Sequence, residues 1–142
     1  MGKFDFTIAE DFLKTLGKLS DVDKVAPQMI NEALPTCSDY LRRGFESAGH
    51  PYSTDHELVR SIKESKATQE RNGAWKGVTR PTGKDKKGVR NMEKLAYYEY
   101  GTSHHGKTHQ KARPIMDRIK NDASLPAQEK MAEVFKREMG LK

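Results

Sequence analysis

The sequence has little cysteine, few aromatic residues and no long hydrophobic run. Cys37 is the only cysteine among 142 residues, so no disulfide can form within the chain, and synthesis in a reducing compartment is expected. No apolar run is long enough to cross a bilayer, and Met1–Phe6 lacks the apolar stretch of a secretory signal. These absences argue against a disulfide-rich secreted scaffold and predict a soluble, cytoplasmic product that does not enter a membrane.

Charge is abundant, and positive charge is in excess. Charged residues make up 32% of the chain and hydrophobic residues 35%, with a formal net charge of +6 and a sequence pI of about 9.4. We expect one domain over residues 1–142, because this length can bury one core but hardly two. The composition is polar for a compact monomer, so the chain is expected to complete its apolar burial against copies of itself. The positive charge either keeps the surface soluble or attracts nucleic acid.

Helical periodicity dominates the N-terminal part of the chain. Apolar spacing predicts an amphipathic helix over Thr7–Leu19 and a longer helix that Ser20 or Asp21 caps and residues 49–51 end. A short helix is expected after a capping segment at 53–55. Its apolar residues are Leu58, Val59 and Ile62.

A β-hairpin is predicted in the middle of the chain, over residues 67–80. Asn72-Gly73 is the strongest turn signal and separates two weakly apolar strands. Because a lone hairpin is marginal in water, it must pack on the helices or lend an edge to a neighbouring subunit. The fold class is therefore predicted as α+β, a mostly helical single domain with a small antiparallel β-sheet packed on helices.

Helical spacing returns in the C-terminal part. One helix is expected to end at Gly101, with a strand as the alternative because two consecutive tyrosines favour β structure. Pro114 is expected to begin another helix. Ser124 and Pro126 are expected to open a separate last helix that Gly140 closes.

Two short blocks of this region resemble a tail-component family of long-tailed phages. The first is KLAYYEYGT at residues 94–102, and the second is ARP at residues 112–114. Three further segments agree in order: VDKVAP at 22–27, LVRSI at 58–62 and RPTGKDKKGVRN at 80–91. The last is similar to the version in prophages of Gram-positive bacteria. The likeness covers most of the chain from about Leu16 onward, although the loop SHHGKTHQK at 103–111 is longer than the family's and lacks its frequent proline.

The resemblance implies a structural protein of the virion that performs no catalysis. It places the chain in the neck or tail-completion region, in head–tail joining between the capsid portal and the tail tube. It implies an oligomeric ring and contacts with other phage neck and tail proteins. No cofactor, metal or small-molecule substrate is expected. The implied localisation is the host cytoplasm during assembly and then the virion.

The two blocks also have an architectural interpretation. A positive φ at Gly101 suits a helix end, and Thr102 can bond backbone groups at the turn. Glu99 and Arg113 flank the loop and are predicted to form a charge-assisted pair, unless Arg113 binds a neighbouring subunit instead. The alternative is a helix–turn–helix whose polar groups are all paired within the segment and which binds no partner protein. The positions in question are Glu99, Tyr100, Gly101, Thr102, Ala112, Arg113 and Pro114.

Residues that could carry catalysis or bind metal are few. His104, His105 and His109 offer imidazoles, but their spacing matches no closed zinc pattern. The segment 83–90 has the glycine spacing of a phosphate loop but lacks the Lys and Ser or Thr that such a loop requires. Cys37 lies in a helical apolar stripe and is expected to be buried and inert.

A basic segment is the best candidate for contact with DNA. Basic side chains track phosphates, and Lys76 with Trp75 stands close by. The alternative is that this segment is a solvent-exposed loop tip that binds no ligand. In a ring, such a loop would face the lumen and meet passing DNA without sequence readout, and outside one it would suit a small basic DNA-binding protein. The residues are Arg80, Lys84, Lys86, Lys87 and Arg90.

Overall fold

The computed structural model describes residues 22–102 and 111–140, and there the chain adopts a mostly helical α+β fold with small antiparallel sheets. The helix predicted over 7–19, with the caps Ser20 and Asp21, lies outside the described residues. The helices are α2 (Val22–Ser47), α3 (His56–Arg60), α4 (Asn91–Tyr100) and α5 (Met116–Glu138). The strands are β1 (Ile62–Glu64), β2 (Thr68–Gln69), β3 (Trp75–Lys76) and β4 (Thr79–Pro81).

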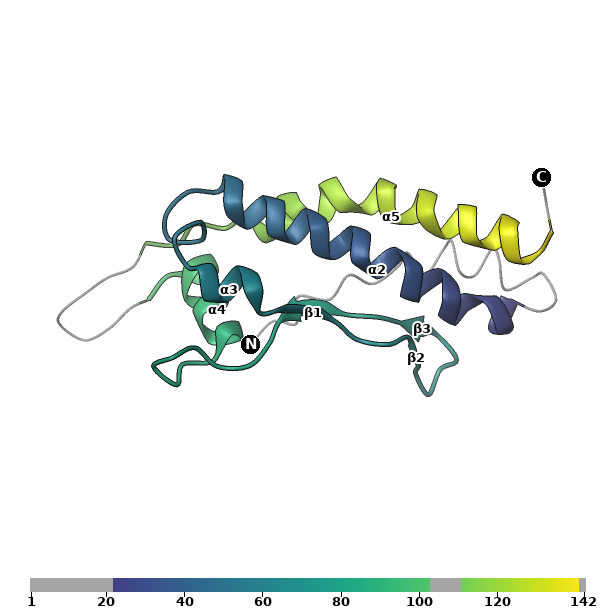
Figure 1. Cartoon of the computed structure of the whole chain (residues 1–142), viewed down its shortest axis with the longest axis horizontal. Coiled ribbons are helices and arrows are strands. Elements are labelled where there is room, and N and C mark those ends of the chain that lie inside the picture. Colours follow the sequence, from purple (N-terminus) through teal and green to yellow (C-terminus); the bar gives the residue numbers. More distant parts are fainter. Residues whose placement is uncertain (1–21, 103–110, 141–142) are drawn as a thin grey trace.

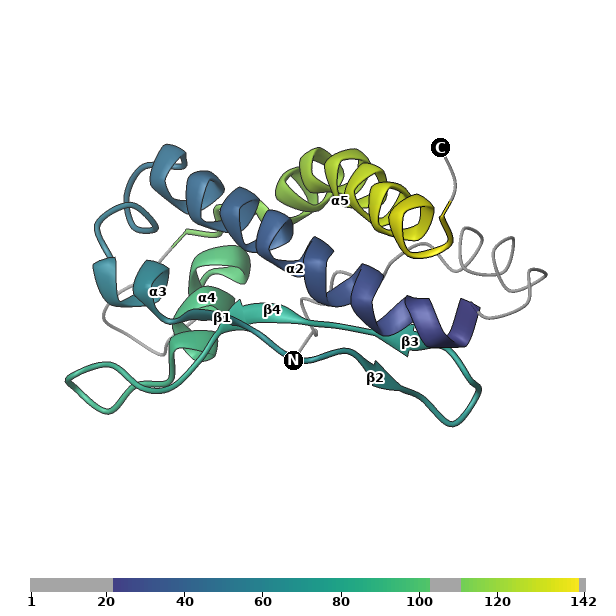
Figure 2. The same ribbon diagram turned by 45° about the vertical axis from the view of Figure 1, so that its right-hand side comes forward.

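Helix α2 is the middle layer of the fold. Helix α5 packs along one side of α2 and runs in the opposite direction, while the strands follow the other side (Figures 1 and 2). The short helices α3 and α4 lie at the end where α2 finishes (Figure 1). Within residues 22–102 and 111–140, no helix covers the side of the strands away from α2.

Two apolar clusters hold these layers together. One lies where α2 ends against α3, α4 and the start of α5, and the other joins the first half of α2 to the second half of α5. Each large side chain buried in this way stabilises the fold by roughly 1.5–3 kcal/mol. The first cluster contains Leu41, Phe45, Tyr52, Leu58, Ile62, Leu95, Met116 and Ile119, and the second Val25, Ala26, Met29, Ala33, Met131, Val134 and Phe135.

Helix α5 is continuous, so the prediction of a separate last helix opened by Ser124 and Pro126 is wrong. Pro126 lies inside α5, and Ala123 and Ala127 on either side are buried. An interior proline costs about 3 kcal/mol. The apolar face that α5 buries against α2 offsets this cost. Pro114 precedes the helix, whose N-cap is Ile115.

The predicted hairpin is confirmed, and it is longer than expected. Its turn closes through a hydrogen bond from Glu70 N–H to the Ala74 carbonyl (2.8 Å). Strand β2 pairs with β3, and β1 extends the ladder by pairing with β4. Ile62, expected in the short helix, begins β1 instead, because its buried side chain joins the first apolar cluster from the strand.

Local signals set the helix ends as expected. The Asp55 carboxylate caps α3 by accepting from Leu58 N–H at 3.0 Å. Helix α4 ends at Gly101, whose φ of 76° suits glycine, and this helix rules out the strand alternative for that segment. Gly140, with φ of 68°, follows the end of α5.

Candidate functional site

The segments 94–102 and 112–116 meet at one buried carboxylate, that of Glu99 on α4. Glu99 is 5% exposed, and one of its oxygens, Oε1, accepts three hydrogen bonds. The donors are the Tyr52 hydroxyl (2.7 Å), Ile115 N–H (2.7 Å) and Met116 N–H (3.1 Å). Two of these donors are otherwise unpaired N–H groups at the start of α5. Glu99 therefore caps α5 from a different helix, and we call Glu99, Tyr52 and the start of α5 the Glu99 junction.

The predicted Glu99–Arg113 ion pair is wrong. The Arg113 guanidinium donates instead to the His50 carbonyl (2.9 Å), and its backbone N–H donates to the Tyr98 carbonyl (2.9 Å). Glu99 points into the core and Arg113 lies on the exposed side, so their side chains do not meet. Glu99 and Arg113 still position the segment that leads into α5, but each does so through its own hydrogen-bond partners.

Tyr52 is the part of the junction that the sequence did not reveal. Its hydroxyl lies 2.7 Å from Glu99 Oε1 and 3.0 Å from the Arg113 carbonyl oxygen. Its ring stacks on Phe45 and meets the edge of Tyr98, with centroids 5.4 and 5.2 Å apart. Burial first, and then the hydrogen bond to Glu99, raises the pKa of Tyr52 well above its ordinary value. No local signal links Tyr52 to Glu99, 47 positions further on.

The outer side of the junction is exposed and carries large side chains. On α4, Tyr97 is 42% exposed and Tyr100 is 62% exposed. Ala112, Arg113 and Pro114 are also exposed, and Arg113 is tied to the last turns of α4 by its bond to Tyr98. Gly101 and Thr102 are half-buried at the end of α4. On its inner side α4 is fixed by the hydrogen bonds of Glu99, and on its outer side the Tyr97 and Tyr100 side chains are exposed.

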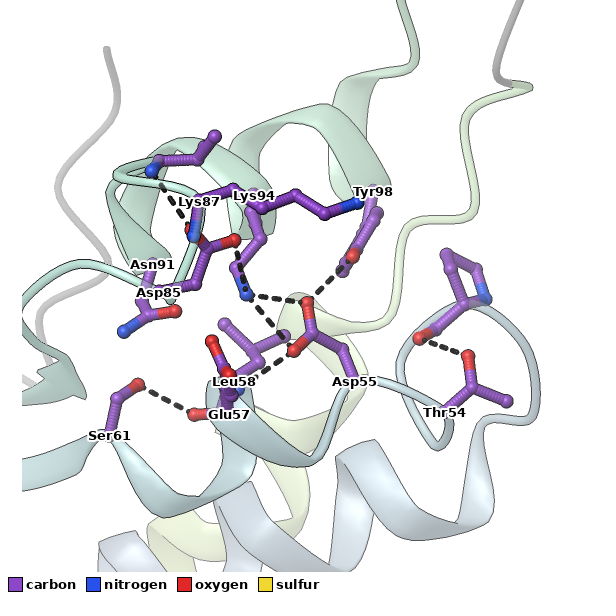
Figure 3. Close-up of polar contacts among 12 residues, drawn as sticks. Thr54, Asp55, Glu57, Leu58, Ser61, Asp85, Lys87, Asn91, Lys94 and Tyr98 are labelled. Atoms are coloured by element: carbon purple, nitrogen blue, oxygen red, sulfur yellow. Dashed lines mark hydrogen bonds and ion pairs between the residues drawn. The ribbon is translucent and has the colours of Figure 1, made fainter.

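A second polar cluster ties the basic loop to the helices. Lys94 of α4 lies between two carboxylates, with Nζ 2.8 Å from Asp55 Oδ2 and 3.3 Å from Asp85 Oδ2. The Tyr98 hydroxyl donates to Asp55 Oδ2 at 2.8 Å (Figure 3). The side chains of Lys94, Asp55 and Asp85 are 11–13% exposed. We call these four residues the aspartate–lysine cluster.

The cluster shifts the titration of its carboxyl groups. Burial alone would raise the pKa of Asp55, but hydrogen bonds from Lys94, Tyr98 and Leu58 N–H outweigh it and lower that pKa. The pKa of Asp85 is also lowered, chiefly because its carboxylate accepts from Val89 N–H. Both carboxylates are therefore more strongly ionised in the folded protein than in the unfolded chain.

The five predicted DNA-facing residues do not form one patch on one element. Arg80 lies on β4, exposed, whereas Lys84, Lys86, Lys87 and Arg90 lie on the loop that follows. Lys84 pairs with Arg90 across an isolated β-bridge. The loop between them folds around the Asp85 carboxylate, which accepts from the backbone N–H groups of residues 87 and 89 at 2.9 Å each.

The described residues offer no evident metal site. Among residues 22–102 and 111–140, no three His, Cys, Asp or Glu side chains gather as metal ligands. His104, His105 and His109 lie outside the described residues. Cys37 is 4% exposed, as expected, and burial raises the pKa of its thiol to about 11. Among the described helices, none combines the length and apolar composition of a membrane-spanning segment.

Comparison of the chain with protein-family models, with curated proteins and with solved structures gives no significant match. A functional assignment therefore rests on the residues and their geometry.

Proposed function

We propose that this protein is a structural subunit of a long-tailed phage or prophage, acting in head–tail joining or tail completion. It performs no catalysis. It assembles with copies of itself into a ring and docks other neck and tail proteins. The site of assembly is the host cytoplasm, and the final location is the virion.

The observation that carries this proposal is the two-sided arrangement of α4. The Glu99 junction holds its inner side, with three hydrogen bonds to one buried oxygen. Its outer side presents Tyr97 and Tyr100 next to the exposed segment 112–114. Tyrosine and arginine are enriched in protein interfaces, where large rigid side chains bind at low entropic cost. A neighbouring copy of this chain is the occupant that the proposal assigns to this surface.

A ring requires the same contact to be repeated around a closed circle. Such an interface joins two different surfaces of each subunit, and small errors of angle accumulate unless the contact segments are rigid. The Glu99 junction supplies this rigidity, because it links α4, the segment before α5 and the start of α5 through buried and partly buried hydrogen bonds.

The experiment is sedimentation velocity and electron microscopy of the full chain, alone and with the products of neighbouring reading frames. Ring-sized particles are expected. The double variant Tyr97→Ser/Tyr100→Ser is expected to weaken each contact at least 10-fold, since interface aromatic residues often contribute about 2 kcal/mol or more.

The matched control is Leu125→Ser on α5, because Leu125 is 62% exposed, as Tyr100 is. This control is expected to assemble normally. A persistent monomer in the presence of portal and tail-tube partners would contradict the proposed function. Assembly lost with Leu125→Ser but kept by the tyrosine variant would refute the assigned surface.

A further inference from the structure

The outer face of the hairpin forms a shallow groove on the side away from α2. This groove has a volume of about 460 Å³ and is lined by side chains from all four strands or their flanks. Its basic residues are Lys63, Lys76 and Arg80, and Ser65, Thr68 and Thr82 are also in the lining. The Thr82 hydroxyl donates to the Ser61 carbonyl (2.8 Å), and the Ser65 hydroxyl donates to the Lys66 carbonyl (3.2 Å). Glu64 is the one acidic residue in the lining. We call this surface the hairpin groove.

The inner face of the hairpin packs on α2 through buried contacts. The outer face therefore points away from α2. Thr79, 1% exposed, hydrogen-bonds the buried Ser38 hydroxyl of α2 at 2.6 Å. Gly77 lies so close to α2 that a Cβ there would stand 2.6 Å from Leu34 and 2.7 Å from Ile30. Because side chains alternate along a strand, fixing Thr79 inward directs Arg80 outward.

Two cations of the groove lie directly opposite each other. The register pairs Lys63 of β1 with Arg80 of β4, and both residues are exposed. Directly opposed side chains on neighbouring strands have Cβ atoms about 5 Å apart, and like charges there are destabilising. Neither side chain makes an ion pair within residues 22–102 and 111–140, whereas Lys76 pairs with Glu70 at 3.1 Å.

A second pair of the same kind follows along the chain. Lys84 lies opposite Arg90 in the isolated β-bridge, and both are exposed without an ion-pair partner in the described part. Four residues of extended chain span at most about 14 Å, which limits the distance from Arg80 to Lys84. Each strand of duplex DNA carries a phosphate about every 3.4 Å along its axis. Two like-charged pairs at this spacing suit an extended polyanion better than a single small anion.

We infer that the hairpin groove binds the sugar–phosphate backbone of duplex DNA. Lys63 and Arg80 contact phosphates directly. Contacts from lysine and arginine to phosphates carry no sequence information, so the proposed contact reads no sequence. This inference does not depend on the tyrosine surface of α4, since the two surfaces share no residue.

The inferred contact differs in position from the DNA contact expected from sequence. The expected residues centred on the loop tip, with Lys86 and Lys87. In the structure that tip bends toward α3, where Lys86 N–H donates to the Glu57 carboxylate at 3.1 Å. Lys63 was not among the expected residues, because only the strand register brings it beside Arg80.

The experiment measures binding of the full chain to a labelled duplex by fluorescence anisotropy, from about 50 to 200 mM salt. The test variant is Lys63→Gln/Arg80→Gln. The charge-matched control is Arg118→Gln/Lys136→Gln on α5, on the other side of α2 from the hairpin (Figure 1).

Losing two phosphate contacts is expected to reduce the slope of log affinity against log salt by about 1.8. Extrapolated from 1 M salt, this corresponds to a loss of about 60-fold in affinity at 0.1 M. The α5 control is expected to keep the wild-type slope. Thermal melts of both variants serve as the folding check, and the test variant is expected to melt no lower than wild type because it removes a like-charge pair.

Several outcomes would overturn the inference. Retention of the wild-type slope by the test variant would refute it, as would a loss of slope by the α5 control equal to that of the test variant. Absence of binding by the wild type at the lowest salt would also refute it, as would binding to anionic phospholipid vesicles without binding to the duplex. A preference of 10-fold or more between two unrelated duplex sequences would contradict contact through the backbone alone.

Discussion

The Glu99 junction leads to a quantitative prediction about folding stability. Glu99→Gln keeps the shape of the side chain and an oxygen acceptor but removes the charge that strengthens three hydrogen bonds. A bond to a charged group contributes about 1 kcal/mol more than a neutral one, so the three together lose about 3 kcal/mol. Relief from burying a charge at 5% exposure offsets part of this loss. We expect a net destabilisation of about 2 kcal/mol.

Urea unfolding followed by circular dichroism measures this change, and the melting temperature should fall by about 6 °C. The control is Glu129→Gln, the same substitution at an exposed position of α5, with an expected change within about 0.5 kcal/mol. Tyr52→Phe, alone and combined with Glu99→Gln, completes a double-mutant cycle with a coupling energy of about 1–2 kcal/mol. A Glu99→Gln variant as stable as wild type would refute the capping role of Glu99, and a coupling energy near zero would refute the hydrogen bond between Tyr52 and Glu99.

Three further predictions concern the core and the aspartate–lysine cluster. Gly77→Ala is expected to cost about 1–3 kcal/mol in urea unfolding, because the new methyl group meets α2 at 2.6 Å; an unchanged midpoint would contradict the packing of the hairpin. The pKa values of Asp55 and Asp85 are lower in the folded state, so the stability they add is complete above about pH 4 and is lost as the pH falls through their folded values. Lys94→Met should therefore lower the melting temperature at neutral pH and flatten its fall on acidification, and an equally steep fall would count against the cluster. Cys37, with its pKa raised to about 11, should not react with a thiol reagent until the protein unfolds; rapid reaction in the native state would show that the thiol is accessible.

Local features of the structure were predictable because their causes lie within a few residues. The Asn72-Gly73 turn, the Asp55 cap of α3 and the end of α4 at Gly101 all depend on backbone preferences at or near the residue itself. The α+β fold class followed from the same signals. These features would be expected in any chain with this sequence pattern.

Predictions failed where packing outweighed a local preference. Pro126 is a strong local signal for a helix boundary, yet α5 continues through it because the helix buries one face along α2. Ile62 follows the helical spacing of Leu58, but pairing with Pro81 draws it into β1. In both cases burial of apolar surface exceeds the local cost, and only the folded chain shows how much surface is buried.

The sequence by itself determined the kinds of element, their turns and the basic character of the surface. Tertiary structure alone decided which distant groups meet: Tyr52 with Glu99, Lys94 with two aspartates, and Lys63 with Arg80. The physical reason is the sequence separation over which each kind of interaction acts. Backbone preferences act over a few residues, whereas hydrogen bonds and charge pairs between segments up to 110 residues apart form only after packing and strand register have placed the donors and acceptors.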